Sequence, residues 1–458
     1  MYIFGVAGLD KYLNNVLKPS SMVVVAGHPG SGKTTLASTI CYSNALRGHR
    51  CLYISFQEDR EKLFNNMKSF DMDFYKLESQ GIIKYVQFPL YFAVDDVVKE
   101  INSLVLDGGY RIVVVDSVNA LLEMVKDDAS KRAWLQNYFY GLPKLVNGAC
   151  ILVAELPYGL EKLKLGAIEF VSDAILILKH KVVNSILTRK LEIRKARFAP
   201  INVAEVPFTI RENSGVEVYI PPLLEEVGPE GPELDVICKP LKDVVNHIHK
   251  GMVMYISYPP DARPIEYVPL LLGIVALNNL KTLVVSYHYP PETVKSLIRK
   301  SFISIGVEGD FVEKLIERHL ELRSLNPYAY GTEDIALKEL SMVKEEHDAV
   351  VFHGIELVSS VTYREKYLQT LYNQLNYLKH LHKLVVRLGS IIDEDTYRFH
   401  SALADMVIRF NPVQEGDKIH YDVYVWRRGS SPSILRYSKF MECCREITEK
   451  LKLKIIEN

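Results

Sequence analysis

The chain has 458 residues, a length that predicts two or three domains rather than a single core. Hydrophobic residues make up 48% of it and charged residues 24%, and no apolar run is long enough to cross a membrane, so we expect a globular, cytoplasmic protein without a membrane anchor. The formal net charge of -1 provides no overall positive field that would attract nucleic acid.

Short apolar runs alternate with segments of helical length through the first half of the chain. The runs are rich in β-branched residues, as parallel strands buried on both faces are, and they occupy residues 22–26, 52–56, 112–115, 151–154 and 174–178. The helical segments between them include residues 34–48, 95–108 and 131–146. This order predicts an α/β fold with a doubly wound sheet, and the alternating pattern after residue 187 predicts antiparallel strands at its edge.

A glycine-rich loop follows the first predicted strand. The sequence GHPGSGKT (27–34) fits the pattern G-x-x-x-x-G-K-[ST] between a strand and a helix, which is the context of a phosphate-binding loop. The backbone N–H groups of such a loop surround phosphates, Lys33 would reach the β- and γ-phosphates, and the Thr34 hydroxyl would bind Mg²⁺. The residues expected to bind ATP are Gly27, His28, Pro29, Gly30, Ser31, Gly32, Lys33, Thr34 and Thr35.

Two acidic residues close the next strands. Asp116 ends the run RIVVVD (111–116), where it would face the same crevice and hold Mg²⁺, although a helix N-cap is the alternative interpretation. Glu58 follows the strand in YISFQED (53–59), where a carboxylate can act as the base that orients a water for attack on the γ-phosphate. The alternatives there are a solvated Glu58 and an ordinary helix cap at Asp59.

The first half resembles the RecA superfamily and, within it, the KaiC-like ATPases. The similar segments are GVAGLDKYL (5–13), GHPGSGKTT (27–35), LYISFQED (52–59), IVVVDSVNAL (112–121), GAIEFVSDAILIL (166–178) and RKLEIRKARF (189–198). The resemblance implies a RecA-like P-loop domain that hydrolyses ATP with Mg²⁺. Family members carry paired glutamates where this chain has Gln57 and Glu58, so we expect slow hydrolysis.

The same resemblance assigns a role to Lys195 and Arg197, which match a Lys-x-Arg pair on a late strand. In the family this pair reaches across a subunit interface to the neighbour's γ-phosphate. Strand alternation puts both side chains on one face, and their charge suits a phosphate. The resemblance therefore implies a homo-oligomer, with a ring and a hexamer favoured, whereas a solvated basic face is the alternative.

After a stretch rich in proline, glycine and glutamate, the pattern of the first half restarts. GMVMYIS (251–257) matches SMVVVAG (21–27) at an offset of 230, and three later segments match in the same order. We expect a tandem duplication with an ATPase domain over residues 1–222, a linker over 223–242 and a second RecA-like domain over 243–458. Each domain should be a mainly parallel twisted sheet flanked by helices.

The second copy lacks the residues that bind and cleave ATP. At the offset of 230, SYPPDARPI (257–265) aligns with the P-loop, and prolines lack the N–H groups that cradle phosphates. The substitutions are Ser257 for Gly27, Pro260 for Gly30, Ala262 for Gly32, Arg263 for Lys33, Pro264 for Thr34, His353 for Asp116, and His288 and Tyr289 for Gln57 and Glu58. We expect a degenerate domain that serves as a scaffold or as a surface for an unknown protein partner.

The function expected from these observations is an oligomeric ATPase that acts as a regulatory switch. The alternative is a recombinase-like, DNA-binding ATPase, for which the segments 121–134 and 155–166 supply basic residues interleaved with acidic ones. Those basic residues are Lys126, Lys131, Arg132, Lys162 and Lys164. The six scattered cysteines predict buried thiols rather than disulfides, and His288, His353 and His400 would be the group to check for a metal.

Overall fold

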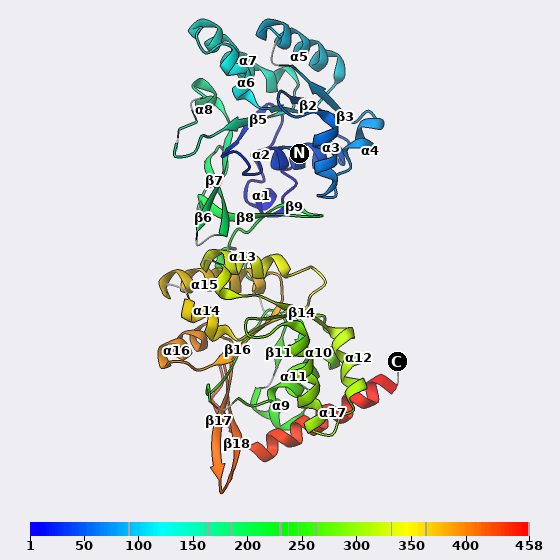
Figure 1. Cartoon of the computed structure of the whole chain (residues 1–458), viewed down its shortest axis with the longest axis vertical. Helices are drawn as coiled ribbons and strands as arrows, with labels where there is room; N and C mark the ends of the chain where they lie inside the picture. The colour runs from blue at the N-terminus through cyan, green and yellow to red at the C-terminus, as the bar shows by residue number, and fades with distance from the viewer. Residues whose placement is uncertain are drawn as a thin grey trace. The chain divides into compact units, whose positions relative to one another are not determined.

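The protein is described by a computed structural model, which covers residues 1–89, 92–160, 162–163, 165–183, 186–228, 231–236, 238–245, 247–261, 263–330, 332–361 and 364–456. The chain forms two compact units, Met1–Ile220 and Pro221–Asn458 (Figure 1). Each unit is built on a mainly parallel sheet with helices on both faces, so the predicted fold class is confirmed. Within these residues no helix is both long and apolar enough to pass through a bilayer.

The sheet of the first unit has the order β3-β2-β4-β5-β1-β6-β7-β8-β9. Neighbouring strands from β3 to β6 are parallel and those from β6 to β9 antiparallel, as the change of pattern after residue 187 predicts. The strands are β1 (Ser21–Gly27), β2 (Cys51–Ser55), β3 (Ile83–Gln87), β4 (Ile112–Asp116), β5 (Ala149–Glu155), β6 (Ala174–Val183), β7 (Ile186–Ala196), β8 (Glu205–Arg211) and β9 (Gly215–Val218). Because β1 lies between β5 and β6, the strand order reverses at its carboxyl end, where ligands of such sheets bind.

Two hydrophobic clusters cover the two faces of this sheet. One contains residues of α1 (Ala7–Tyr12), α2 (Lys33–Ala45), α3 (Arg60–Lys68) and α4 (Phe74–Ser79), and the other residues of α5 (Val94–Gly108), α6 (Val118–Met124), α7 (Ala129–Leu145) and α8 (Ala167–Val171). Local sequence sets the ends of α5: Asp95 and Asp96 lie in its first turn, where the helix dipole favours acids, and Gly109 ends it with φ of +59°.

The second unit repeats this arrangement in a sheet of order β14-β13-β15-β16-β12-β17-β18-β19. The pairs from β14 to β17 are parallel and the last two antiparallel. The strands are β12 (Val253–Tyr258), β13 (Thr282–Ser286), β14 (Leu320–Ser324), β15 (Ala349–His353), β16 (Leu384–Ser390), β17 (Met406–Glu415), β18 (Lys418–Arg427) and β19 (Ser433–Leu435), with β10 (Glu233–Leu234) and β11 (Ile248–His249) paired separately.

Equivalent hydrogen bonds correct the alignment of the two P-loop regions by one residue. The Asp173 carboxylate accepts the Met22 N–H at 2.9 Å, and the Asp405 carboxylate accepts the Val253 N–H at 2.9 Å. The central strands therefore align at 253 − 22 = 231 rather than 230. Tyr258, not Ser257, lies where Gly27 does. The sequence match was misleading because apolar strands have few landmarks.

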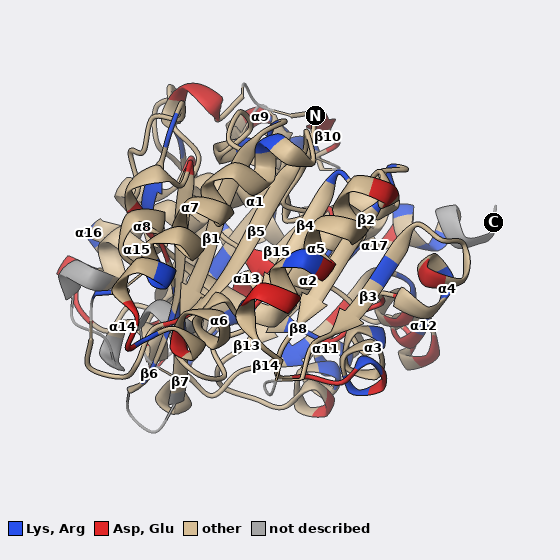
Figure 2. Cartoon of the chain, turned by 90° about the horizontal axis from the view of Figure 1, so that it is seen from above, with Lys and Arg blue, Asp and Glu red and all other residues tan. Residues whose placement is uncertain are grey.

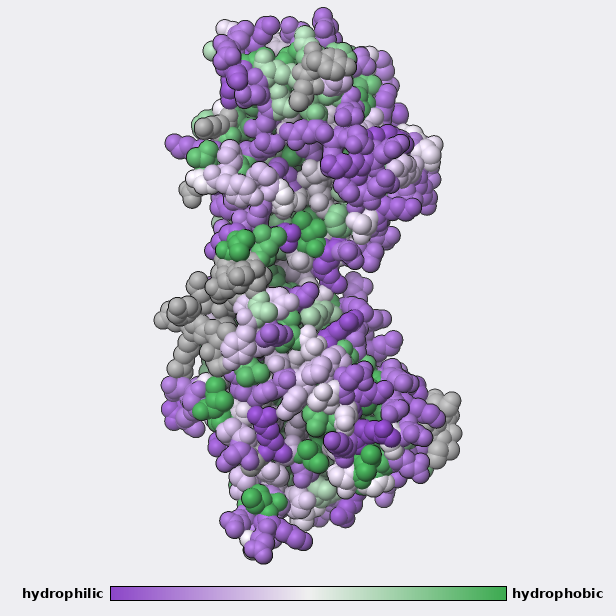
Figure 3. Space-filling view, viewed as in Figure 1, coloured by the Kyte–Doolittle hydropathy of each residue, from purple (hydrophilic) through white to green (hydrophobic). Residues whose placement is uncertain are grey.

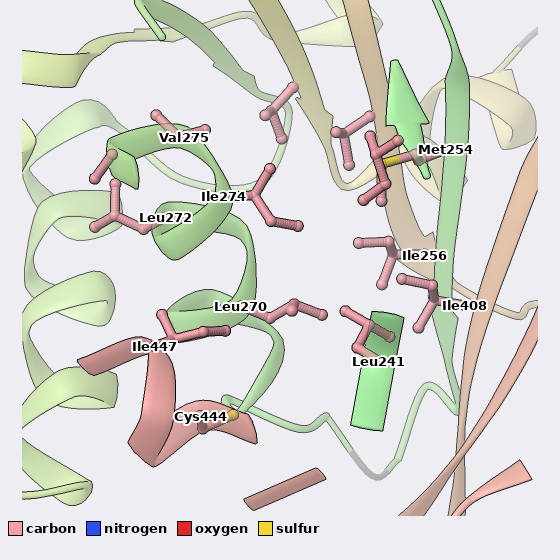
Figure 4. Close-up of a cluster of buried hydrophobic side chains, with 14 of the residues drawn as sticks. Leu241, Met254, Ile256, Leu270, Leu272, Ile274, Val275, Ile408, Cys444 and Ile447 are labelled. Carbon is pink, nitrogen blue, oxygen red and sulfur yellow. The ribbon is translucent and has the colours of Figure 1, made fainter. Parts of the chain in front are cut away.

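Helices on each side of the second sheet enclose the core of this unit. They are α9 (Lys239–Val245), α10 (Tyr267–Leu277), α11 (Pro291–Ser304), α12 (Gly309–His319), α13 (Thr332–Met342), α14 (Ile355–Val361), α15 (Arg364–His380), α16 (Glu394–Leu403) and α17 (Tyr437–Ile456), with short turns η1 (Leu224–Glu226) and η2 (Pro327–Ala329). Figure 4 shows Leu270 and Ile274 of α10 directed toward Met254 and Ile256 of β12, whereas Leu272 and Val275 lie on the other side of the helix.

The stretch expected to be a linker, 223–242, contains η1, β10 and the start of α9. Val236 and Leu241 belong to the core of the second unit, and a disulfide joins Cys238 to Cys443 of α17. The interpretation of all six cysteines as thiols is therefore wrong for this pair. Sequence spacing could not reveal it, because the two cysteines lie 205 residues apart.

Charge and hydropathy are distributed as burial requires. Figure 2 shows Lys, Arg, Asp and Glu mainly on helices and loops, while a strand such as β1 is tan; all seven of its residues are buried. On the face seen in Figure 3 most residues are hydrophilic, and hydrophobic residues occur in small separate groups. Such scattered exposure is normal for a protein surface.

Candidate active site

The loop after β1 has the backbone shape of a phosphate cradle. Gly30 and Gly32 have φ of +71° and +100°, values that side chains rarely allow, and Gly32 leads directly into α2. A Cβ on Gly27 would collide with the Leu178 carbonyl, whereas one on Gly30 would meet nothing within 4 Å. The loop is therefore packed tightly against β6 at its base and clear of other atoms at its tip.

The polar groups of this loop fit a phosphate ligand. Lys33 Nζ donates to the His28 carbonyl at 3.0 Å, inside the loop. Burial lowers the pKa of the Lys33 ammonium, while Glu155 and Asp116 oppose that shift. Ser31 Oγ and His28 Nδ1 are buried without a partner among the described residues. A lysine ammonium and an unpartnered serine hydroxyl beside the start of α2 suit an anion such as a nucleotide phosphate.

Asp116 meets the start of α2 at the end of β4. Thr34 Oγ1 and Tyr53 Oη both donate to its Oδ2, at 2.9 Å and 3.0 Å. Burial raises the pKa of the Asp116 carboxyl, and these two hydrogen bonds oppose the rise. A hydroxyl and a carboxylate oxygen side by side are the ligands that Mg²⁺ prefers. The alternative role as a helix cap is not seen, since the N-cap of α6 is Ser117.

Glu58 is held by its backbone at the end of β2. Ser55 Oγ bonds both the carbonyl and the N–H of Glu58, and Tyr85 Oη donates to the same carbonyl at 2.6 Å. The Glu58 carboxylate is half-buried and lies 3.5 Å from Lys62 Nζ. Asp59 caps α3 by accepting the Lys62 N–H at 2.8 Å, as one alternative expected. These bonds fix the position of the Glu58 backbone at the end of the strand. Its carboxylate makes only a weak ion pair with Lys62.

The segment after β5 contacts the phosphate-binding loop directly. Tyr158 Oη donates to the Pro29 carbonyl at 3.1 Å and lies 2.9 Å from His180 Nε2, and its ring centroid is 4.9 Å from that of His28. Close by, Gln57 Nε2 donates to Glu155 at 3.2 Å. The ends of β2, β5 and β6 thus surround the loop with polar side chains.

Lys195 and Arg197 lie away from the loop of their own chain. Lys195 lies at the end of β7 and Arg197 just after it. Ala196 between them pairs with Ala174 at the start of β6, whereas Gly27 pairs with Leu178 farther along β6. Lys195 Nζ and Arg197 donate to the carbonyl of Phe170 in α8, at 2.7 Å and 2.9 Å. The two cations therefore point together, as alternation predicts, but not toward Lys33.

Comparison with known proteins assigns this unit. The model of the KaiC ATPase family matches residues 3–222. The first unit belongs to the KaiC family of ATPases. It is 24% identical over 194 residues to the circadian clock oscillator protein KaiC of Picosynechococcus sp., of Thermostichus vulcanus and of Synechococcus elongatus.

These matches cover 42% of this chain and 37–38% of each relative. The chain thus matches well under half the length of the curated relatives. The family accounts for the KaiC-type unit, and the activity and partners of the whole chain remain matters for a proposal.

The second unit keeps the frame around this site but not its chemistry. Ser286 Oγ accepts the Tyr289 N–H at 3.0 Å, as Ser55 does for Glu58 in the KaiC-type unit. At the place of Asp116, His353 Nδ1 bonds Ser286 at 3.1 Å. With the corrected alignment Arg263 falls at Gly32 and Pro264 at Lys33, while Ala262 lies outside the described residues. No cation therefore takes the position of Lys33.

The three histidines considered for a metal do not form a ligand group, although the rings of His288 and His353 are neighbours with centroids 6.0 Å apart. His288 Nε2 bonds Glu356 at 2.7 Å, and His400 Nε2 contacts Ser359 at 3.3 Å. Among the described residues, the one group with metal-ligand spacing is Glu321, Glu346 and His347. Lys344 lies 2.9 Å from Glu321 in that group, so a cation is already present.

The basic residues named for DNA binding are partly neutralised. Lys126 lies 3.1 Å from Glu123 and Lys131 lies 3.8 Å from Asp95. Lys164 lies outside the described residues. Two of the basic residues thus have acidic neighbours, which adds nothing to the DNA-binding alternative.

Five residues of the site were not anticipated from the sequence. They are Tyr53, Tyr85, Glu155, Tyr158 and His180. Glu155 could have been found, because it ends β5 as Asp116 ends β4 and parallel strands share their carboxyl edge. The tyrosines and His180 carry no such signal, since their roles depend on which strands and loops are neighbours.

Proposed function

We propose that the KaiC-type unit binds ATP with Mg²⁺ and hydrolyses it slowly, as the nucleotide-dependent part of an oligomeric regulatory switch. The proposal depends above all on the contact of Thr34 Oγ1 with Asp116 Oδ2 at the base of the loop that encloses Lys33. The KaiC family assignment supports the same nucleotide.

The chain's own residues would position the reacting phosphate. Mg²⁺, when bound, supplies positive charge beside the β- and γ-phosphate oxygens. The loop N–H groups and Lys33 would bind the phosphates, and Thr34 and Asp116 would hold the metal. Glu58 would orient the attacking water and receive its proton. Since Gln57 takes the place of the first glutamate in the family's pair, a single carboxylate does this work.

A neighbouring subunit would complete the site. Lys195 and Arg197 lie away from the Lys33 of their own chain, so they can act on a γ-phosphate only in another copy. Charge placed there stabilises the transition state more than the bound substrate, which is how such arginines accelerate hydrolysis. The proposal therefore includes a ring, with a hexamer favoured, and a cytoplasmic protein partner contacted through the second unit.

Mixing two inactive variants tests this arrangement. Arg197→Ala keeps a sound P-loop, and Lys33→Ala keeps a sound Lys195–Arg197 pair. We expect Arg197→Ala to lower hydrolysis by about 10²-fold, with little effect on ATP binding. In a mixed oligomer some sound pairs face sound P-loops, so partial activity should return.

The control shows that the two variants exchange subunits. Differently tagged chains are mixed with ATP and Mg²⁺, and light scattering is used to monitor the exchange. If exchange occurs and no mixing ratio restores activity, the trans role of Arg197 is wrong. Calorimetry with a non-hydrolysable ATP analogue should show one site per chain, and failure to bind any analogue would contradict the proposed function itself.

A further inference from the structure

The second unit contains an apolar cavity of about 100 Å³ between its sheet and helices α10 and α11. Its lining includes Leu272 and Val275, the α10 residues that Figure 4 shows on the side away from β12. Leu297 of α11 also lines it and is 38% exposed, so the cavity reaches the surface. An engineered cavity of comparable size, about 150 Å³, binds benzene.

The exposed fractions of the strand residues under this cavity show that the packing is incomplete on one face of the sheet only. Val284 of β13 and Val351 of β15 each retain 8% of their surface, although they lie in the middle of central strands. Their neighbours Leu283, Val285 and Val350, which point to the opposite face, retain 0%. One face of the sheet is therefore close-packed and the other is not, which is unusual because protein interiors pack densely.

The KaiC-type unit shows what fills the same space there. The pairings Ser55–Asp116 and Ser286–His353 align β2 with β13 and β4 with β15, so Tyr53 corresponds to Val284. Tyr53 is 1% exposed, and its hydroxyl donates to Asp116 Oδ2. The first unit has tyrosine and the second has valine at this position. The second unit therefore lacks a phenol ring between its sheet and α10, the helix that corresponds to α2.

Asp116, which accepts the Tyr53 hydroxyl in the first unit, also has an equivalent in the second unit. His353, which takes the place of Asp116, lines the cavity. Its Nδ1 bonds Ser286, and no bond to its Nε2 is found among the described residues. Burial and the neighbouring His288 lower the pKa of His353 to about 4, so the ring is neutral near pH 7. A neutral imidazole can donate to or accept from a hydroxyl.

We propose that this cavity binds a small neutral phenol, with its ring where Tyr53 lies in the first unit and its hydroxyl against His353. None of the lining residues is a lysine, arginine, aspartate or glutamate. A charged ligand would therefore lose its hydration without gaining a partner. A nucleotide is excluded at this place by the same apolar lining. The second unit then binds a ligand of its own, independently of ATP.

The test uses phenol, toluene and benzoate as probes on the full-length chain. We expect one phenol per chain, with a dissociation constant on the order of 1 mM, a modest affinity for a ligand of this size. Toluene keeps the ring without the hydroxyl and should bind about 3–10-fold more weakly, as the loss of one hydrogen bond predicts. Benzoate should not bind. Intermolecular NMR contacts between phenol and cavity methyl groups would locate the site in the unaltered protein.

Val284→Tyr supplies the ring covalently. This variant should lose phenol binding by at least about 10-fold and gain about 2–4 °C in thermal midpoint. Val285→Tyr is the matched control, because it inserts the same ring on the close-packed face and should lower the midpoint. Should Val284→Tyr fail to fold, Val284→Phe provides the ring without the hydroxyl.

Two results would overturn the proposal: no NMR contact between phenol and the cavity in the unaltered protein, or unchanged phenol affinity in a folded Val284 variant. Equal affinity for phenol and toluene would overturn the role of His353. Lys33→Ala should bind phenol normally, so a failure of the proposed ATP site and a failure of this site remain distinguishable.

Discussion

The two units share a scaffold and differ where the strands end. Both keep an aspartate that accepts an N–H at the start of the central strand, Asp173 and Asp405, and both keep a serine at the end of the next strand along the chain, Ser55 and Ser286. Only the first keeps glycines, a lysine and an acid around its loop. The hydrogen bonds that set the fold are therefore separable from the groups that face a ligand.

The sharpest contrast between the units lies in their loops. Lys33→Ala should lower ATP hydrolysis by about 10²–10³-fold, because it removes a preorganised cation from the reacting phosphates. Arg263→Ala, the control, should leave the rate unchanged within about twofold. Steady-state turnover of both variants measures this, and comparable losses would contradict the assignment of a single active loop.

The shared aspartates provide the next comparison. Asp405→Asn and Asp173→Asn should each destabilise their unit by about 1–3 kcal/mol, because each weakens a buried hydrogen bond to a central strand. Asp417→Asn, in the turn between β17 and β18, should change nothing. Urea unfolding measures the differences, and a large loss in one unit alone would show that the scaffold is not equivalent.

Lowering the pH should change the free energy of unfolding of the two units differently. Burial holds the pKa of His353 at about 4, below its usual 6.5. The contribution of the neutral ring to the stability of the second unit is therefore full above pH 6.5 and is lost as the pH falls toward 4. Burial raises the pKa of Asp116, which acts in the opposite direction because it favours the folded state at low pH. Through His353 alone the second unit should lose about 1–2 kcal/mol from pH 7 to pH 5, and the lowered pKa of the buried His400 acts in the same direction.

Hydrogen exchange in β15 and β4 would follow the two units separately. His353→Gln should reduce the pH dependence of β15 and leave that of β4 as it was. An identical pH dependence of both strands in the unaltered chain would contradict the prediction.

The smallest expected effect concerns how Asp116 is positioned. Tyr53→Phe removes one of its two hydrogen bonds and should lower turnover by about 5–10-fold, with a rise in the Mg²⁺ concentration needed for half-maximal rate. Tyr255→Phe, a buried tyrosine of the second unit, should leave both quantities unchanged. A loss of stability without any change in Mg²⁺ dependence would mean that Tyr53 only fills space.

Sequence reasoning reached the parallel strands and the P-loop because both depend on local patterns. Hydrophobic runs located β1, β2, β4, β5 and β6, but β3 was missed since only part of it is buried. Position along the chain could not show that Tyr53 meets Asp116, that Tyr158 contacts Pro29, or that the second P-loop alignment was one residue out. Each of these depends on which strands are neighbours in space.

The bonds that Lys195 and Arg197 make with the Phe170 carbonyl have a further consequence for a ring. A cation that reaches toward another subunit must first release the last turn of α8. Hydrogen bonds from charged groups contribute about 1.5–3 kcal/mol each, so this release opposes the approach to the phosphate and leaves the end of α8 without its donors. The nucleotide in one subunit would thereby set the mobility of a helix in the next, a physical route for passing its state around the ring.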